Sequence, residues 1–121
     1  MIAVLDGFPD DVVAITAVGR VTRRDYDEVL IPKVNAVLEK RGKVRCYYEL
    51  GPRFEGFDAG AVWEDFRLGV AHLARWERVA IVSDLDWIRV TANLFRFLLP
   101  ARLGVFPTAE ANEARAWIVA P

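Results

Sequence analysis

Short apolar runs rich in β-branched residues alternate with longer segments of helical periodicity, and this alternation constrains the fold more than any other feature. The expected strands are residues 2–5, 12–18, 43–50, 78–83 and 103–106. The helical patterns occupy residues 22–41, 58–76, 87–99 and 108–118. Strands that alternate with helices form parallel sheets through right-handed crossovers, whereas the first two strands are close enough to form an antiparallel hairpin. The order ββαβαβαβα therefore predicts an α/β fold with a mixed, mostly parallel sheet and flanking helices.

Length, charge and cysteine content narrow the class of protein. The 121 residues correspond to one domain spanning 1–121, and 54% of them are hydrophobic, which is enough for a substantial core. A formal net charge of -1 argues against nucleic-acid binding, which needs a clear basic excess. The single cysteine, Cys46, cannot form an internal disulfide. No apolar run is long enough to span a membrane, and the amino terminus lacks the features of a signal peptide. We therefore expect a cytoplasmic protein.

Several residues mark where the helices should begin and end. The expected N-cap residues of three helices are Thr22, Asp58 and Thr108. Asp25 stands three residues after the first of these caps, which is the spacing of a capping box. Pro32 lies inside the first helical pattern and predicts a kink or the start of a second segment, while Gly42 should end that helix. The residues expected to face inward from the last helix are Ala111, Ala114, Trp117 and Ile118.

The third expected strand, residues 43–50, alternates cleanly between two faces. One face would carry Val44, Cys46, Tyr48 and Leu50. On this face Cys46 is interpreted as a small core residue. The following residues 51–56 have the glycine spacing of a phosphate-binding loop, but Phe57 and Asp58 stand where that motif requires a lysine and a hydroxyl residue. We expect a simple turn there and no nucleotide site.

Two aspartates, Asp84 and Asp86, follow the fourth strand at the position where open α/β sheets usually bind ligands. Paired aspartates in such a turn also occur in phosphotransferases of the haloacid-dehalogenase type, where a metal and a lysine complete the site. No lysine follows Lys43 in this chain, so the sequence does not support that chemistry. We expect both aspartates to be structural, and Asp86 is the better candidate for the N-cap of the helix that begins at Trp87.

The remaining chemistry-bearing side chains also lack partners. His72, the only histidine, lies beside the apolar stripe of its helix and is expected to be a hydrogen-bonded structural residue. With one histidine and one cysteine, the chain cannot assemble the usual zinc ligand set. A carboxylate-only Mg²⁺ or Ca²⁺ site has no sequence signature here. Because no acid, base and nucleophile converge, we predict a protein that is not an enzyme and uses no metal or cofactor.

The segment 87–99 is apolar on nearly every face of the expected helix. The residues expected to face the sheet are Trp87, Thr91, Leu94 and Leu98. Ile88, Phe95 and Leu99 would then remain uncovered, and a helix with such a surplus usually forms an interface or is buried on two sides. Its uncovered side would contact a second copy or another protein, bind an apolar ligand, or simply join the core. The candidate ligand or interface residues are Trp87, Ile88, Phe95, Leu98 and Leu99.

Several motifs, most of them between residues 65 and 117, carry a resemblance to a known family. The motifs are Asp65-Phe-Arg-Leu-Gly-Val-Ala-His72, Trp76-Glu-Arg-Val-Ala-Ile-Val82, Asp84, Trp87, Phe106 and Glu113-Ala-Arg-Ala-Trp117. With these motifs the whole chain resembles the SpoIIAA-like, or STAS-like, proteins of bacteria. The resemblance implies a mixed α/β sheet related to anti-sigma-factor antagonists and to the lipid-binding CRAL-TRIO fold. The family supplies no established activity, and its fold relatives imply protein regulation or binding of a hydrophobic small molecule.

One property of the anti-sigma antagonists does not carry over to this chain. Those proteins are switched by phosphorylation of a serine or threonine at the helix start after the third strand, and residues 50–60 contain neither. We therefore predict a non-enzymatic binding or regulatory domain that acts through protein–protein contact, as a homodimer or with a protein partner, at helix 87–99. The alternative prediction is a carrier of a lipid or other small apolar molecule in a pocket between that helix and the sheet.

Overall fold

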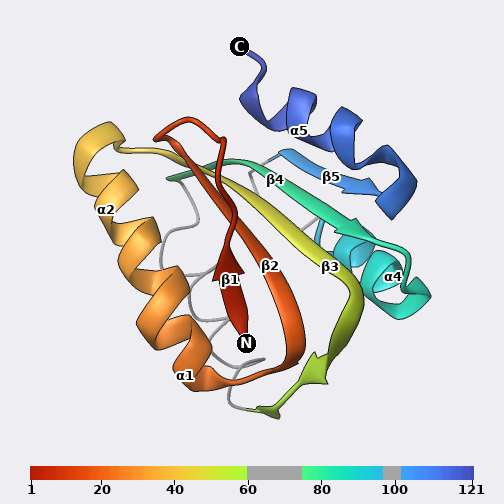
Figure 1. The fold of residues 1–121 in the computed structure, drawn as a ribbon. Coiled ribbons are helices and arrows are strands. Elements are labelled where there is room, and N and C mark those ends of the chain that lie inside the picture. Colours follow the sequence, from red (N-terminus) through yellow and green to blue (C-terminus); the bar gives the residue numbers. More distant parts are fainter. Residues whose placement is uncertain (60–74, 97–101) are drawn as a thin grey trace.

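A mixed sheet of five strands forms the centre of the described structure (Figure 1). The computed structural model describes residues 1–59, 75–96 and 102–121. The strands are β1 (Ile2–Val4), β2 (Val12–Val21), β3 (Val44–Phe57), β4 (Trp76–Ser83) and β5 (Arg102–Phe106). They lie in the sheet in the order of the sequence; β1 pairs antiparallel with β2, and every other neighbouring pair is parallel. The predicted α/β fold with a mixed, mostly parallel sheet is confirmed.

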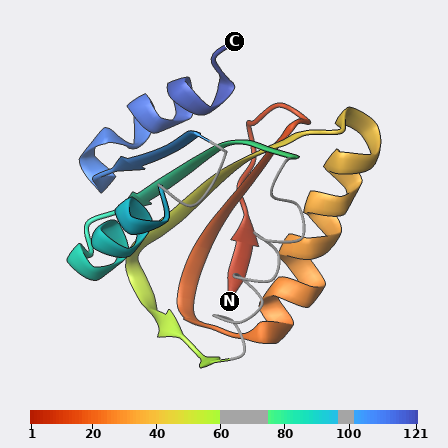
Figure 2. The same cartoon turned by 180° about the vertical axis from the view of Figure 1, so that it is seen from behind.

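The helices are divided between the two faces of the sheet. The helical elements are α1 (Arg23–Asp25), the π-helical turn η1 (Tyr26–Leu30), α2 (Ile31–Arg41), α4 (Asp86–Phe95), the 3₁₀ turn η3 (Thr108–Glu110) and α5 (Ala111–Val119). Residues of α2 and α4 pack into one hydrophobic cluster, whereas α5 packs into another on the opposite face. Seen from both sides, α5 lies at the β4–β5 end of the sheet and α2 toward its other end (Figures 1 and 2). Most of the predicted helix 58–76 lies outside the described residues.

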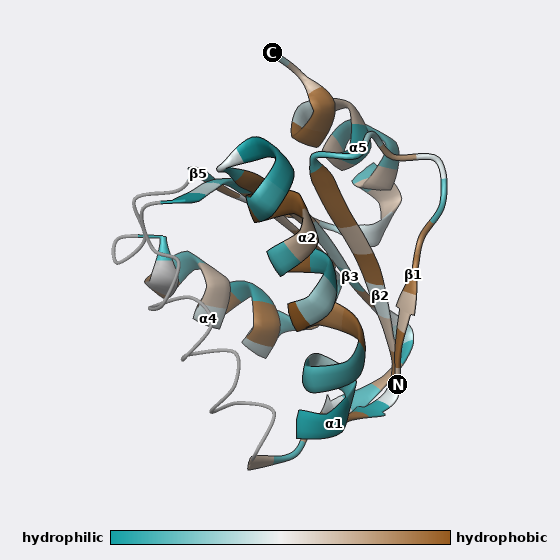
Figure 3. Cartoon of the chain, turned by 90° about the vertical axis from the view of Figure 1, so that its left-hand side faces the viewer, coloured by the Kyte–Doolittle hydropathy of each residue, from teal (hydrophilic) through white to brown (hydrophobic). Residues whose placement is uncertain are grey.

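Both faces of β3 are buried, which makes this strand the centre of the core. The α2-side cluster contains Val44, Cys46, Tyr48 and Leu50 from β3, as the alternation predicts. Tyr47 points to the other face and is fully buried under α5 with Ala114 and Ile118. On the α2 side the hydroxyls of Tyr26 and Tyr48 lie 3.1 Å apart and share a hydrogen bond. Seen from the side, the apolar strands lie between the two helical layers (Figure 3).

The first helix follows the boundary signals in its sequence. Thr22 is the N-cap of α1. The backbone N–H of Thr22 donates to Asp25 Oδ2 at 2.8 Å, and the backbone N–H of Asp25 donates to Thr22 Oγ1 at 3.3 Å. The predicted capping box is therefore confirmed. The π-helical turn precedes Pro32, which has no backbone N–H to continue the α-helical pattern, and α2 begins at the adjacent residue. Gly42 ends the helix with a left-handed backbone, at φ 75°.

Residues 51–57, which the sequence analysis expected to form a turn, continue β3 as a strand. The expectation was wrong because β2 does not stop at Val18: it passes through an irregularity at Gly19 (φ 66°) and runs on to Val21. The longer β2 offers pairing partners to the extended β3, with Gly19 opposite Phe54 and Val21 opposite Phe57. The glycine spacing of residues 51–56 therefore belongs to a paired strand, which cannot cradle a phosphate.

Candidate functional site

The turn after β4 is held by side-chain hydrogen bonds within the protein. Asp84 Oδ1 accepts the backbone N–H of Thr108 at 2.8 Å and thereby ties the end of β4 to the start of η3. The Ser83 hydroxyl oxygen accepts the backbone N–H of Leu85 at 3.2 Å. This hydrogen bond gives Asp84 a structural contact, and the prediction that Asp84 has no catalytic role stays a prediction.

The two N-caps expected for the later helices are both wrong. The N-cap of α4 is Leu85, Asp86 is already the first helical residue, and no side chain caps this helix end. The helix thus begins at Asp86, one residue earlier than predicted, directly after the turn in which the Ser83 hydroxyl accepts the Leu85 N–H. Thr108 likewise does not cap the last helical element, because it lies inside η3, and its buried hydroxyl has no hydrogen-bond partner among the described residues. The inward-facing side of α5 is confirmed, with Ala114 and Ile118 fully buried.

The buried face of α4 differs from the predicted one. Ile88 and Ala92, four residues apart, are 7% and 9% exposed and face the sheet. Trp87, Val90 and Leu94 are 51%, 60% and 66% exposed. The prediction that Trp87 and Leu94 face the sheet and that Ile88 is uncovered is therefore wrong. Instead, the small side chain of Ala92 lies on that side, which lets the helix axis approach β4 and β5 closely.

The exposed apolar residues of α4 form a stripe that continues into an aromatic cluster. Trp87, Val90 and Leu94 follow the i, i+3, i+7 spacing of one helix face. The Trp87 ring lies 6.1 Å from the ring of Phe54 and 6.2 Å from that of Phe57, and these two rings lie 4.9 Å apart. Sequence reasoning missed this cluster because it placed Phe54 and Phe57 in a turn, whereas both lie in β3.

The other predicted site residues lie outside the part of the chain that the structure describes. These residues are His72, Leu98 and Leu99, together with the side chain of Phe95. The predictions made for them therefore stay predictions. In the described ranges, no group of three metal-ligating side chains comes together. None of the described helices is both long enough and apolar enough to cross a lipid bilayer.

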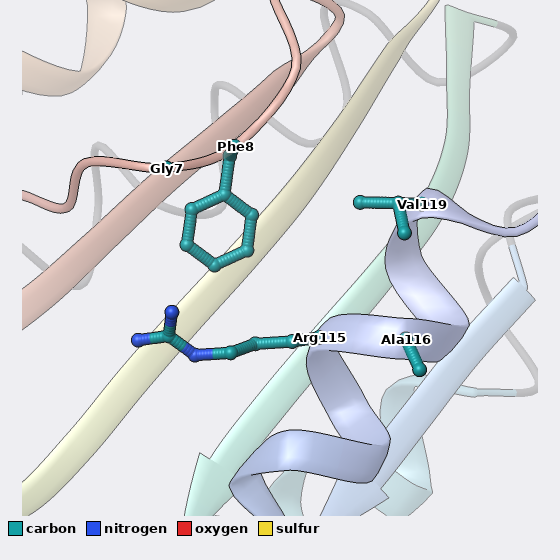
Figure 4. A pocket seen from close by; sticks show the side chains of 5 residues that line it. All are labelled: Gly7, Phe8, Arg115, Ala116 and Val119. Atoms are coloured by element: carbon teal, nitrogen blue, oxygen red, sulfur yellow. The ribbon is translucent and has the colours of Figure 1, made fainter.

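A second feature lies on the opposite face of the sheet, between α5 and the turn that joins β1 to β2. A cavity of about 210 Å³ is lined by Gly7, Phe8, Arg115, Ala116 and Val119 (Figure 4). The guanidinium carbon of Arg115 lies 5.0 Å from the centre of the Phe8 ring and 5.6 Å from that of the Tyr47 ring. Beneath this arginine the Tyr47 hydroxyl is buried, and Arg115 is the side chain that interacts with it.

The pKa of the Tyr47 hydroxyl is above its usual value. Burial is the main cause, and the negative charge of Glu49 adds to it, whereas a hydrogen bond with Arg115 and the positive charge of that residue oppose the rise. The hydroxyl therefore stays protonated at neutral pH. Another cavity, of about 520 Å³, lies at the β5 edge and is lined by Arg96, Arg102, Leu103, Gly104, Val105, Phe106 and Trp117.

Two arginines on the same face hold the end of α5. Arg78, which is 7% exposed, donates to the carbonyl oxygens of Trp117 at 2.7 Å, Ala120 at 2.9 Å and Pro121 at 3.0 Å. Arg45 donates to the carbonyl oxygens of Ile118 and Ala120 and pairs with Glu77. Their positive charges meet the carboxyl end of the helix, where the helix dipole favours cations. These arginines are structural, and their side chains are engaged with the protein's own carbonyls.

Comparison with known proteins identifies the family. A crystal structure of an uncharacterized protein of the DUF3478 family from Shewanella loihica PV-4, described as having a SpoIIAA-like fold, superimposes with a TM-score of 0.76. The two sequences are 24% identical, and the match covers 97% of this chain and 93% of that chain. No curated protein matches the sequence. The model of the SpoIIAA-like family matches residues 12–119, which is most of the chain. The protein belongs to the SpoIIAA-like family.

Proposed function

We propose that the protein is a non-enzymatic binding or regulatory domain that acts through protein–protein contact, and that it forms a homodimer through the exposed stripe of α4. The single observation that carries this proposal is the row of Trp87, Val90 and Leu94, each more than half exposed on one helix face. Contiguous apolar surface of this kind, rimmed by charged residues, is typical of protein contact sites. The rim here is supplied by Asp86, which is exposed, and by Arg96 at the end of the helix.

The aromatic cluster supports the proposal because it fixes one end of the stripe. Trp87 packs against Phe54 and Phe57, so its ring is already held in place before a partner binds. A preorganised aromatic side chain loses little conformational entropy on association. Tryptophan is also among the residues that most often dominate the binding energy of protein interfaces. A face that is identical on both copies and self-complementary suits a two-fold homodimer.

The effect of removing one stripe residue can be estimated from its exposure. Full burial of a leucine side chain contributes about 1.5–3 kcal/mol, and Leu94 is 66% exposed. Covering it in a dimer therefore contributes about 1–2 kcal/mol per copy, or about 2–4 kcal/mol for the two copies. The Leu94→Asp variant loses this contribution and also buries a charge. We expect its dimer dissociation constant to rise at least about 30-fold.

Size-exclusion chromatography with light scattering tests the homodimer. The wild-type chain should have the mass of a dimer and Leu94→Asp that of a monomer at the same concentration. Ala36→Asp is the matched control, because it places the same charge at an exposed helical position of α2. It should remain a dimer. A wild-type chain that stays monomeric up to about 1 mM, or a control that dissociates as readily as Leu94→Asp, would refute the proposal.

The alternative prediction, a carrier for a lipid or other apolar molecule between α4 and the sheet, has less support. Ile88 and Ala92 fill the contact between this helix and the core. The smaller cavity described above lies on the opposite face of the sheet, and the larger one lies at the β5 edge and meets this helix at its C-cap, Arg96. Native mass spectrometry of protein purified from cells tests the carrier directly. A bound mass that is lost on denaturation would favour it over the homodimer, whereas an empty chain would count against it.

A further inference from the structure

We infer that the outer edge of β5 binds an extended, acidic segment of another protein, which adds to the sheet as one more strand. β5 is the last strand of the sheet, so one of its edges has no neighbouring strand. Among the described residues, that edge makes no backbone hydrogen bond. The binding surface consists of β5, Trp117 and Arg96 and does not include the exposed stripe of α4. The inference therefore goes beyond the proposed homodimer.

The free edge lies in a groove, which is the cavity of about 520 Å³ described above. All five residues of β5 line it, together with Trp117 of α5 and Arg96 at the end of α4. Spread over the roughly 17 Å length of a five-residue strand, this volume gives a cross-section of about 30 Å², or about 6 Å across. Neighbouring strands lie about 4.7–4.9 Å apart, whereas a helix with its side chains is about 10–12 Å wide. The groove therefore fits a single extended chain and not a helix.

The edge and one wall of the groove supply contacts for such a segment. Alternate residues of an edge strand direct their N–H and C=O groups away from the sheet, and these groups pair readily with a strand from another chain. On the α5 side, the centres of the Phe106 and Trp117 rings lie 5.8 Å apart, and the guanidinium carbon of Arg78 lies 5.5 Å from the Trp117 ring centre. These contacts hold the rings in place, so a side chain of the added strand would meet a preorganised aromatic wall.

The other face of β5 offers aliphatic surface. Because side chains alternate along a strand, Leu103 and Val105 point to the face opposite to that of Phe106. Both are only partly buried, and neither belongs to the two core clusters that the described residues form. Residues that favour strands, such as valine and threonine, would cover this surface on one face and the rings on the other.

Two arginines determine the charge of the segment that binds. Arg102 is the first residue of β5, and Arg96 ends the helix that leads into it, so both charges lie toward the amino end of the strand. Both side chains are exposed, and neither forms an ion pair within the part of the chain that the structure describes. Acidic residues opposite them would form favourable cross-strand pairs. The β5 strand of a second copy contains no acidic residue, so an acidic partner fits the groove better than a second copy does.

A designed peptide with the sequence acetyl-Thr-Val-Thr-Val-Thr-Glu-Glu-amide is the probe. Antiparallel pairing is slightly more stable than parallel pairing, and it places the carboxyl end of the peptide at the amino end of β5, beside the arginines. Titration of the ¹⁵N-labelled chain, followed by NMR, should show shift changes at the amides of residues 102–106 and at the Trp117 indole. We expect a dissociation constant of about 1 mM or below.

Charge reversal tests the role of the arginines. The same peptide with two lysines in place of the two glutamates should bind at least about fivefold more weakly, because like charges replace opposite charges across the strands. Arg102→Glu should remove this preference, since it leaves one positive and one negative charge at the groove. Its melting temperature should stay within about 3 °C of the wild-type value, because the side chain is exposed. Arg41→Glu, the same change at an exposed position of α2, should leave both affinities within about twofold.

Two N-methylated peptides separate strand addition from charge attraction alone. Each is methylated at one of the two sets of alternate backbone amides, and only one set points toward β5 in an added strand. One peptide should therefore bind at least about tenfold more weakly than the unmethylated peptide, and the other should bind within about threefold of it.

Several results would overturn the inference. They are the absence of shift changes up to about 5 mM peptide, shift changes only away from β5, equal binding of the glutamate and lysine peptides, and equal binding of the two N-methylated peptides. Shifts of β5 that depend on protein concentration without peptide would assign the edge to a second copy instead. Slow exchange of every β5 amide in the peptide-free chain would show that the edge is already covered.

Discussion

The hydrogen bonds that Arg78 makes at the end of α5 predict a large loss of stability in the Arg78→Met variant. Methionine retains much of the apolar stem of arginine but removes three donated hydrogen bonds and the guanidinium stacked 5.5 Å from the Trp117 ring. Arg45 still donates to Ala120, so two carbonyls, those of Trp117 and Pro121, lose their charged donor.

The size of the effect follows from these contacts. A hydrogen bond to a charged group contributes about 1.5–3 kcal/mol, but these bonds lie at a helix end that water can reach in part, and they are not additive. We therefore expect Arg78→Met to lower the free energy of unfolding by about 2–4 kcal/mol. For a chain of this length, about 4 °C per kcal/mol corresponds to a fall in melting temperature of about 8–16 °C. Arg78→Lys should be intermediate, because an ammonium keeps the charge without the planar fork.

Urea unfolding followed by far-UV circular dichroism measures this loss. The midpoint should fall while the denaturant dependence stays constant, which would show that stability and not the unfolded state has changed. Arg41→Met, at an exposed position of α2, is the control and should cost less than about 0.5 kcal/mol. If Arg78→Met and Arg41→Met unfold at the same urea concentration, the arginine bonds do not hold α5 as described.

Two further substitutions test other parts of the fold. Burial tends to raise the pKa of Asp25, but the hydrogen bonds from the Thr22 backbone and hydroxyl outweigh it and hold the pKa below the ordinary 3.8. The ionised carboxylate therefore stabilises the fold fully above its ordinary pKa, and this contribution is lost as the pH falls through the lowered pKa. Asp25→Asn should be less stable than the wild-type chain at neutral pH, but it should lose less stability on acidification from about pH 5 to pH 2. Gly104→Ala should cost about 1–3 kcal/mol in urea unfolding, because its Cβ would lie 2.8 Å from Phe106 Cε2 and 3.1 Å from Trp117 Cζ3; a neutral result would show that these rings move aside.

The elements that could be predicted from the sequence are those fixed by local interactions. The Thr22–Asp25 capping box, the helix end at Gly42 and the alternation of β3 depend on residues within a few positions of one another. The extension of β3 depends instead on how far β2 runs, a non-local condition that residues 51–57 do not reveal. For the same reason these residues resembled a loop when taken alone.

The candidate sites were harder to predict because they depend on tertiary contacts. The α4 segment is apolar on nearly all sides, so its periodicity did not indicate which face is buried. The buried face is the one that carries Ile88 and the small Ala92. The roles of Arg45, Arg78 and Arg115 could not be read from spacing, because their partners lie 35 or more positions away in the chain or on another element.

The strand order has a consequence for the dynamics of the protein. The two crossovers whose helices the structure describes, α2 between β2 and β3 and α4 between β4 and β5, pass over the same face of the sheet. The opposite face is covered by α5 and the β1–β2 turn. Release of α5 would therefore expose Tyr47 and Val82 while leaving the paired strands in place. Amide hydrogens of α5 should exchange with solvent through this partial opening, at a lower free energy than those of β3, whose exchange requires unfolding of the whole sheet.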